Sequence, residues 1–357
     1  MSIDVILKDR SGTDITYDAS GGVSLLTTQN TQQIFYPGSD DPGYITFSSP
    51  GAFTLKIKRS LVYPDQEKLW AGTVQWSKDL ETWTDVLTTT LINSGADNKI
   101  YVRGYGNSFL ASDYNHQNSS LFELTGSAIS VSGNIASLLD ADAVKHGLLP
   151  QLGPYAFYSL FAGNASLSSI ENLILPYSDL VYNCYARMFE NCVGITSTPE
   201  LPITSPAGFS CFRMFAGCTA LTHTPDILPA EKTYTQCYGS MFSGCTSLTS
   251  VPKLPATSLG GTCYYLMFDG CTSLTTISTL PGTTIPVNAY YGMFRNCSSL
   301  KLSATQTGIY QYPFRMPTSG TGSAQSNSFT NMFTGTGGTF TGTPSVNTTY
   351  YTDHEPV

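Results

Sequence analysis

The sequence predicts a mostly β protein with short helices, in which a β-sandwich-like domain precedes a solenoid of stacked repeats. Composition is the first reason: only 12% of the 357 residues are charged, while Gly (32), Pro (20) and Tyr (22) are abundant. This composition favours strands and tight turns over helical bundles. The second reason is a Met-Phe pair that recurs through much of the second half of the chain. Before the repeats, short alternating runs of apolar and polar residues indicate strands.

Residues 1–36 predict a strand-rich arm, which a Pro/Gly-rich loop from Pro37 to Gly43 separates from the rest. So few residues cannot fold alone, and their strand edges can pair with a neighbouring chain. We therefore expect the arm to attach the protein to its assembly. The stretch from Leu7 to Thr13 resembles a short segment that starts many tailed-phage structural proteins.

Residues 44–125 predict the β-sandwich-like domain. Alternation at Leu55 and Ile57 indicates a strand whose apolar side chains share one face. The later segment Ser77 to Trp83 resembles the Asp-box hairpin of sialidase-like propellers, although Leu80 stands where that box has Gly. This single copy predicts a hairpin with a buried Trp. A glycan-cleaving enzyme that depends on Asp79 is the alternative interpretation.

Residues 126–154 predict a junction that caps the N-terminal end of the solenoid, which covers residues 155–305. One repeat cannot bury its own apolar stripe, so neighbouring repeats must stack. Residues 306–357 depart from the repeat and become rich in Gly and Thr, which predicts a C-terminal cap and tail.

Each repeat predicts a short helix followed by a very short strand. Cys237, Met241 and Cys245 follow the i, i+4, i+8 spacing of one helix face. Leu248 and Val251 then predict the strand, which a Pro ends. The period of 26–27 residues suits one unit of a repeat solenoid.

The repeated pattern Met-Phe-x-x-Cys-x-x-Leu, with a downstream Leu-Pro, resembles the BspA-type (treponemal) leucine-rich repeat. Five consecutive copies in one register carry the resemblance, which covers about Tyr155 to Leu302. It implies a leucine-rich-repeat solenoid of a family found in surface proteins of gut and oral bacteria and in their phages. Members of that family commonly serve in adhesion and protein–protein contact.

All nine Cys lie in the repeats and form two series, each at one repeat position. Their spacing fits no zinc pattern such as C-x2-C, and a helix would hold the two Cys of one repeat too far apart for a disulfide. Buried, reduced thiols are therefore expected. The first series is Cys184, Cys211, Cys237 and Cys263, and the second is Cys192, Cys218, Cys245, Cys271 and Cys297.

Tyr residues beside the Met-Phe pairs form the candidate binding surface. They either pack between repeats with their hydroxyls at the surface, or form an exposed ladder that stacks on sugars or protein. The sequence leaves both interpretations open. The candidates are Tyr238, Tyr264, Tyr265, Tyr290 and Tyr291.

Neither catalysis nor a cofactor or metal is expected. The four His have no partner pattern, and the chain has no nucleophile elbow, P-loop or metalloprotease motif. As neighbours of a solvated turn, Asp140 and Asp142 are more simply a cap than a catalytic pair. A net charge of −8 argues against nucleic acid, and no run of 18 apolar residues suggests membrane insertion.

The first residues lack a basic stretch followed by an apolar run, so no export signal is expected. Cytosolic synthesis with a Thr-, Ser- and Tyr-rich composition is the profile of a virion component released by lysis. We therefore expect a non-enzymatic, homo-oligomeric phage virion or tail-fibre protein. Its arm would bind other virion proteins, and its solenoid would bind a host-surface protein or glycan. A bacterial cell-surface adhesin is the alternative.

Overall fold

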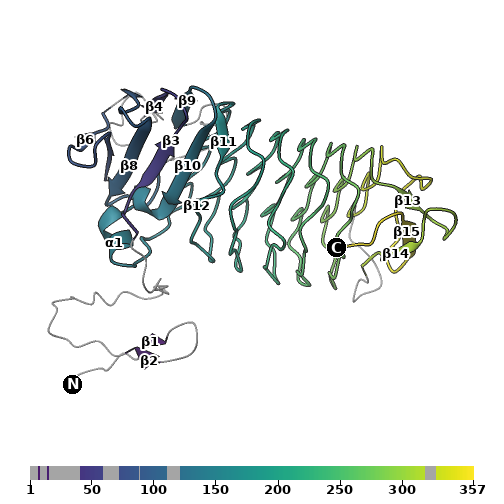
Figure 1. Cartoon of the computed structure of the whole chain (residues 1–357). Helices are drawn as coiled ribbons and strands as arrows, with labels where there is room; N and C mark the ends of the chain where they lie inside the picture. The colour runs from purple at the N-terminus through teal and green to yellow at the C-terminus, as the bar shows by residue number, and fades with distance from the viewer. Residues whose placement is uncertain are drawn as a thin grey trace, which may run out of the picture.

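The computed structural model of the chain describes residues 7–8, 14–15, 41–58, 72–87, 89–110, 121–317 and 327–357. The described part is mostly β with few helices, as predicted (Figure 1). Within the predicted arm, only the antiparallel pair β1 (Leu7–Lys8) and β2 (Asp14–Ile15) is described, and the rest of the arm lies outside the described residues. None of the helices in the described part has the length and apolarity needed to cross a membrane.

Two sheets form the part before the repeats, and the larger one also includes β11 and β12 of the first repeat. Their strands are β3 (Ile45–Ser48), β4 (Thr54–Lys58), β5 (Thr73–Ser77), β6 (Thr84–Asp85), β7 (Thr89–Asn93), β8 (Lys99–Tyr105), β9 (Phe122–Thr125), β10 (Ile129–Asn134), β11 (Leu167–Ser169) and β12 (Leu173–Ile174). The larger sheet has the order β11-β10-β3-β8-β5-β6, with β12 also paired to β10, and the smaller has the order β7-β4-β9. The sheets share one apolar core, in which the rings of Phe47 and Phe122 lie 5.7 Å apart.

Strands β5 and β6 form the predicted hairpin, in which Trp76 pairs with Thr84. Leu80 in the connecting turn has a φ of 65°, in the left-handed region that suits the Gly of the resembled motif. Trp83, however, is only half-buried, so the prediction of a buried Trp is wrong at this position.

Strand β10 joins the two sheets to the repeats. It pairs antiparallel with β3 on one side, and parallel with β11 and β12, which belong to the first repeat, on the other. The 3-10 helix η3 (Ile135–Leu138) and the helix α1 (Ala141–Lys145) follow it. Asp140 caps α1 through a hydrogen bond from the backbone of Ala143 at 3.0 Å, as predicted.

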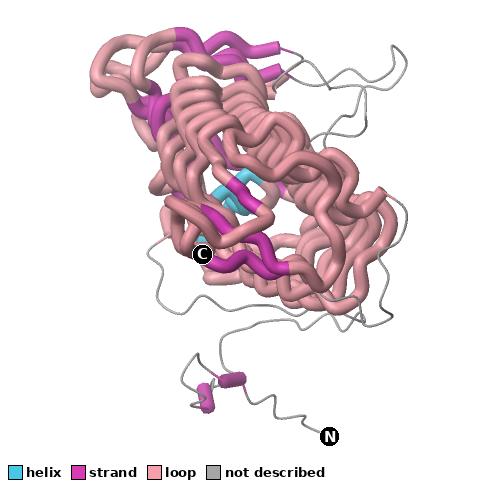
Figure 2. Tube along the Cα trace, turned by 90° about the vertical axis from the view of Figure 1, so that its right-hand side faces the viewer, coloured by secondary structure: helices cyan, strands magenta, loops and turns pink. Residues whose placement is uncertain are grey.

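The repeats form seven consecutive coils, which lie side by side along the molecule (Figures 1 and 2). We number them 1 to 7 by their Leu-Phe or Met-Phe pairs, which are Leu160-Phe161, Met188-Phe189, Met214-Phe215, Met241-Phe242, Met267-Phe268, Met293-Phe294 and Met332-Phe333.

The helix predicted from Cys237 to Cys245 is wrong: this segment is a run of consecutive tight turns. Its backbone N–H groups alternate between two kinds of partner. The N–H of Met241 donates within its own coil, to the carbonyl of Tyr238 at 3.2 Å. The N–H of Phe242 donates to the carbonyl of Met267 in the next coil, at 2.9 Å. Each coil thus bonds to its neighbour without a regular strand.

Every fourth residue of this turn segment has a positive φ: 52° at Gln236, 52° at Ser240 and 76° at Gly244. A left-handed residue at the third position is what a type II turn requires. The chain therefore places two side chains inward and the next two outward, so Met241 and Phe242 are both fully buried. This pattern repeats every four residues, which is close to the 3.6-residue period of a helix.

The strand predicted at Leu248 and Val251 is also absent. The parts of the coils that lie between successive turn segments instead pair through isolated parallel bridges, such as Ile227 with Lys253 and Ser258 with Thr284. The very short strands of the prediction are thus reduced to single paired residues at other positions.

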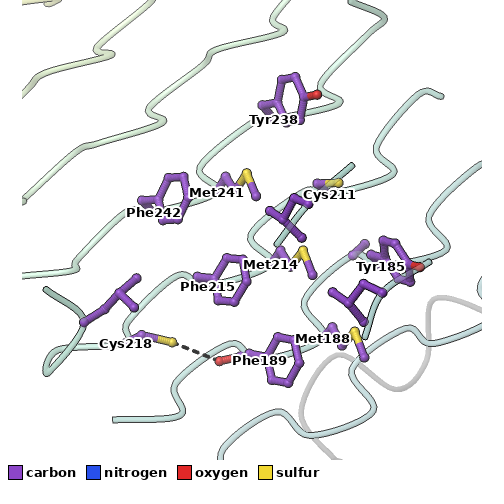
Figure 3. Close-up of a cluster of buried hydrophobic side chains, with 14 of the residues drawn as sticks. Tyr185, Met188, Phe189, Cys211, Met214, Phe215, Cys218, Tyr238, Met241 and Phe242 are labelled. Carbon is purple, nitrogen blue, oxygen red and sulfur yellow. Dashed lines mark hydrogen bonds between the residues drawn. The ribbon is translucent and has the colours of Figure 1, made fainter. Parts of the chain in front are cut away.

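A stack of Phe rings runs through the coils (Figure 3). Neighbouring rings have centroids 5.3–5.8 Å apart and interplanar angles of 8° or less. At one end Phe161 meets Phe122 of the two-sheet core edge-on, at 5.6 Å. At the other end Phe333 meets Phe314 and Phe340 edge-on. There a small sheet of β13 (Leu302–Ser303), β15 (Thr349–Thr352) and β14 (Tyr312–Arg315) covers the last coil.

Candidate binding surface

The nine Cys lie inside the coils, and their predicted burial is confirmed: all nine are buried and free. In the second series each thiol donates a hydrogen bond to the Phe carbonyl of the preceding coil, as Cys218 does to Phe189 at 3.1 Å (Figure 3). Burial raises the pKa of Cys192 and Cys245 to about 12, so both thiols stay protonated at neutral pH. These thiols serve the packing of the coils.

Cys211 does not share the repeat position of Cys184 and Cys237, so this part of the predicted register is wrong. The backbone N–H of Cys211 donates to the Cys237 carbonyl of the next coil at 3.0 Å, just as that of Tyr185 donates to Ser210 at 2.9 Å. Cys211 therefore occupies the Tyr position of its coil. The row of stacked rings at that position is interrupted in coil 3.

Three of the five candidate Tyr are core residues. Tyr238, Tyr264 and Tyr290 expose at most 2% of their surface, and their rings stack from coil to coil at 5.7–6.1 Å. Their assignment to a binding surface is wrong, because they belong to the inward pair of the turn segment. Only Tyr265 and Tyr291 point outward, where their half-buried rings stack on each other at 5.2 Å.

The outward residues of the turn segments form one face along the coils, which we call the outer turn face. In coils 1 to 3 it carries four aromatic rings in sequence, the aromatic run, which the sequence pattern did not reveal. Consecutive rings lie 5.7–5.8 Å apart in edge-to-face contact, and Tyr182 is 41% exposed. The run consists of Tyr155, Tyr182, Phe209 and Phe212.

Two members of the aromatic run stand at left-handed backbone positions. Tyr155 has a φ of 60° and Phe209 a φ of 58°. At the equivalent position three other coils have Asn183, Asn288 and Asn327, the residue type that tolerates this conformation best after Gly, and the remaining two have Gln236 and Thr262. The left-handed backbone at this position is therefore a feature of every coil. The edge-to-face contacts of the four rings and the exposure of Tyr182 are what mark the aromatic run as a candidate site.

Charged residues lie beside the aromatic rings on the outer turn face. The carboxylate of Glu190 is buried and pairs with both Arg187 and Arg213. Further along, Arg295 pairs with Asp269 at 2.7 Å, and the hydrogen bond that the guanidinium donates to Asp269 raises the pKa of Arg295. The pairs of Glu190 with Arg213 and of Asp269 with Arg295 link neighbouring coils, whereas Arg187 pairs with Glu190 inside coil 2, so Glu190 and its two Arg together carry a net positive charge.

The outer turn face combines aromatic rings, of which Tyr182 is exposed and the others are half-buried, with ion pairs between Arg and acidic side chains. Within the described residues, no group of three or more His, Cys, Asp or Glu could hold a metal ion. The period of four in the sequence was the signal that could have found the aromatic run, because it assigns Phe212 and Tyr265 to the outward pair and Tyr264 to the inward pair.

Comparison with known proteins found no matching family model, no matching curated protein and no matching solved structure.

Proposed function

We propose that the chain is a non-enzymatic virion appendage protein of a bacteriophage. In this proposal the coils are a leucine-rich-repeat solenoid, and the outer turn face binds a partner on the host surface. The observation that carries the proposal is the aromatic run, in which four rings are in edge-to-face contact along coils 1 to 3 and Tyr182 is 41% exposed. Exposed Tyr together with Arg is also the composition of the residues that dominate binding energy at protein interfaces.

The architecture supports an extended binding surface. Each coil donates backbone hydrogen bonds to the next, and a single stack of Phe rings passes through all seven coils. Such a stack presents equivalent positions at regular intervals, and an extended regular surface of this kind is suited to binding an external partner. The two-sheet part, as a β-sandwich-like domain, and the N-terminal arm would then attach the solenoid to the particle.

The aromatic run can be tested with a variant that relieves backbone strain. Phe209→Asn combined with Phe212→Ser should retain the melting temperature, because Asn accepts the left-handed conformation. It should also lower binding of the labelled protein to a responsive strain from a panel of gut and oral bacteria by about tenfold or more. The control is Ile227→Thr, which removes a side chain that is 42% exposed on the other half of coil 3. Unchanged binding by the double variant would exclude the aromatic run as the binding site.

The virion assignment is tested separately by location. Antibodies against the chain should label purified phage particles from the producing culture and sediment with them. Labelling of the bacterial envelope, with none on particles, would instead support the cell-surface adhesin.

A further inference from the structure

A second cluster of aromatic residues lies on the larger sheet, on the side that faces away from the core. There the guanidinium of Arg103 on β8 lies over the ring of Trp83 at 3.8 Å and over that of Tyr105 at 5.1 Å. Its Nε donates to the side-chain oxygen of Gln75 on β5, at 3.0 Å. The ring of Tyr44 lies 6.1 Å from that of Trp83. We call these residues the Arg103 cluster.

The hairpin between β5 and β6 holds Trp83 in place. One carboxylate oxygen of Asp79 accepts hydrogen bonds from the Ser77 hydroxyl at 3.0 Å and from the Thr82 backbone at 2.8 Å, and it accepts another from Glu81. The indole N–H of Trp83 donates to the Leu80 carbonyl at 3.2 Å. Leu80 itself has a left-handed φ of 65° and is 40% exposed. The turn thus accepts an unfavourable residue conformation while it fixes the Trp83 ring against Arg103.

The guanidinium of Arg103 is fixed in position, but no carboxylate among the described residues neutralises its charge. The chain carries 25 Asp and Glu, yet Arg103 forms no ion pair with any described residue. Its terminal nitrogens likewise have no hydrogen-bond partner within the described part of the chain. A guanidinium fixed through Nε and covered by aromatic rings keeps its outer N–H groups in a planar fork. That fork matches the two oxygens of a carboxylate.

Asp85, on the nearby strand β6, limits which carboxylate compounds fit beside Arg103. The amide of Gln75 donates to one oxygen of Asp85 on β6 at 2.7 Å. Asp85 is exposed, so its other oxygen can accept a hydrogen bond from a ligand. A second carboxylate close to Asp85, such as a peptide with several acidic side chains, would be repelled. A ligand with one carboxylate and several hydroxyl donors satisfies both Arg103 and Asp85.

We propose that the Arg103 cluster binds a carboxylate-bearing sugar, with the carboxylate on Arg103, a hydroxyl on Asp85 and the sugar ring against the aromatic side chains. This site lies on the two-sheet part. It is therefore independent of the proposed role of the outer turn face.

Isothermal titration of the full-length protein can test the site with glucuronate, galacturonate and N-acetylneuraminate. At least one should bind saturably below about 10 mM, and glucose and galactose should bind at least tenfold more weakly. Arg103→Lys retains the charge but loses the fork, so it should weaken binding of the acidic sugar about tenfold or more. The matched control, Arg315→Lys on β14, should bind like the parent.

Three outcomes would overturn the proposal. One is the absence of saturable binding by all three acidic sugars. Another is equal affinity for acetate or for a diaspartate peptide, which would show a simple anion site. The third is unchanged affinity in Arg103→Lys. Circular dichroism of each variant separates a lost site from a lost fold. Binding to bacterial cells through the outer turn face is measured separately, so failure here leaves that proposal intact.

Discussion

At the scale of single residues, the inward Met and Phe side chains decide stability. Met241 and Phe268 are fully buried between neighbouring coils. Met241→Ala and Phe268→Ala should each lower the free energy of unfolding by about 2–5 kcal/mol, because each leaves a cavity that the stacked coils cannot close. Ile227→Ala, at a side chain 42% exposed, is the control and should cost less than about 1 kcal/mol. Urea unfolding measures all three, and a parental midpoint for either core variant would contradict the inward assignment.

The buried thiols predict a loss of stability at alkaline pH. Burial raises the pKa of Cys184, Cys192, Cys245 and Cys263 to about 12, from an ordinary value of 9.0. The folded-state pKa lies above the unfolded one, so the unfolded chain releases these protons first as the pH rises. The stability linked to the thiols is therefore complete below pH 9.0 and is lost progressively as the pH approaches about 12.

Thermal melts over that pH range measure this effect, and thiol labelling checks its cause. All nine thiols should react slowly in the folded protein at neutral pH and rapidly after denaturation. Rapid labelling of several thiols in the folded state would contradict their burial.

At the scale of elements, one substitution distinguishes the turn segment from a helix, because it should have opposite effects on stability in the two structures. Gly244 has a φ of 76°. Gly244→Ala should lower the free energy of unfolding by about 1 kcal/mol, because Ala is strained at a left-handed position. In a helix interior the same change would be stabilising by a similar amount. Gly244→Asn is the matched control and should cost less, since Asn191 and Asn296 stand at the equivalent position with φ of 59° and 61°. A stabilised Gly244→Ala variant would restore the helix interpretation.

The sequence predicted the mostly β class, the hairpin at Trp76 and the cap at Asp140, because alternation and capping are local signals. It did not predict the turn segment. Inward pairs such as Met241-Phe242 recur every four residues, and over a short segment this period is close to that of a helix. The difference lies in the left-handed backbone at every fourth residue, which Gly244 signals in the sequence but Ser240 does not.

The candidate surface was predicted only in part, for the same physical reason. Adjacent Tyr264 and Tyr265 are alike in sequence, yet one is inward and the other outward. Only the pair alternation of the turns separates them. The register of Cys211 was misread because the repeat length itself varies between 26 and 27 residues. Cys211 lies 27 residues after Cys184, whereas Phe215 lies 26 residues after Phe189, so a shift of one position passed unnoticed.

At the scale of the whole molecule, one apolar core extends from the two sheets to the last coil. Strand β10 pairs with β3 and with the first coil, and Phe161 joins the two-sheet rings to the Phe stack. Neighbouring coils cannot bury their apolar faces alone, so their stability is shared through interfaces. The two sheets are thus the N-terminal cover of the stack, as the small sheet of β13, β14 and β15 is its C-terminal cover.

The final prediction concerns the C-terminal cover of the stack. Removal of residues 304–357 would leave the faces of Phe294 and Tyr290 without the rings of Phe333 and Phe329 that now stack on them at 5.8 and 5.7 Å. An apolar end of this kind exposed to water promotes association, so the truncated protein should aggregate or melt well below the parent.

The control for this truncation deletes one complete repeat, residues 236–261, and so brings coil 3 against coil 5 with both covers intact. That variant should remain soluble and fold, because equivalent residues still meet at every interface. Size-exclusion chromatography and thermal melts compare the two proteins. If the truncated protein were the more stable of the pair, the number of coils, and not the covering of their ends, would determine stability.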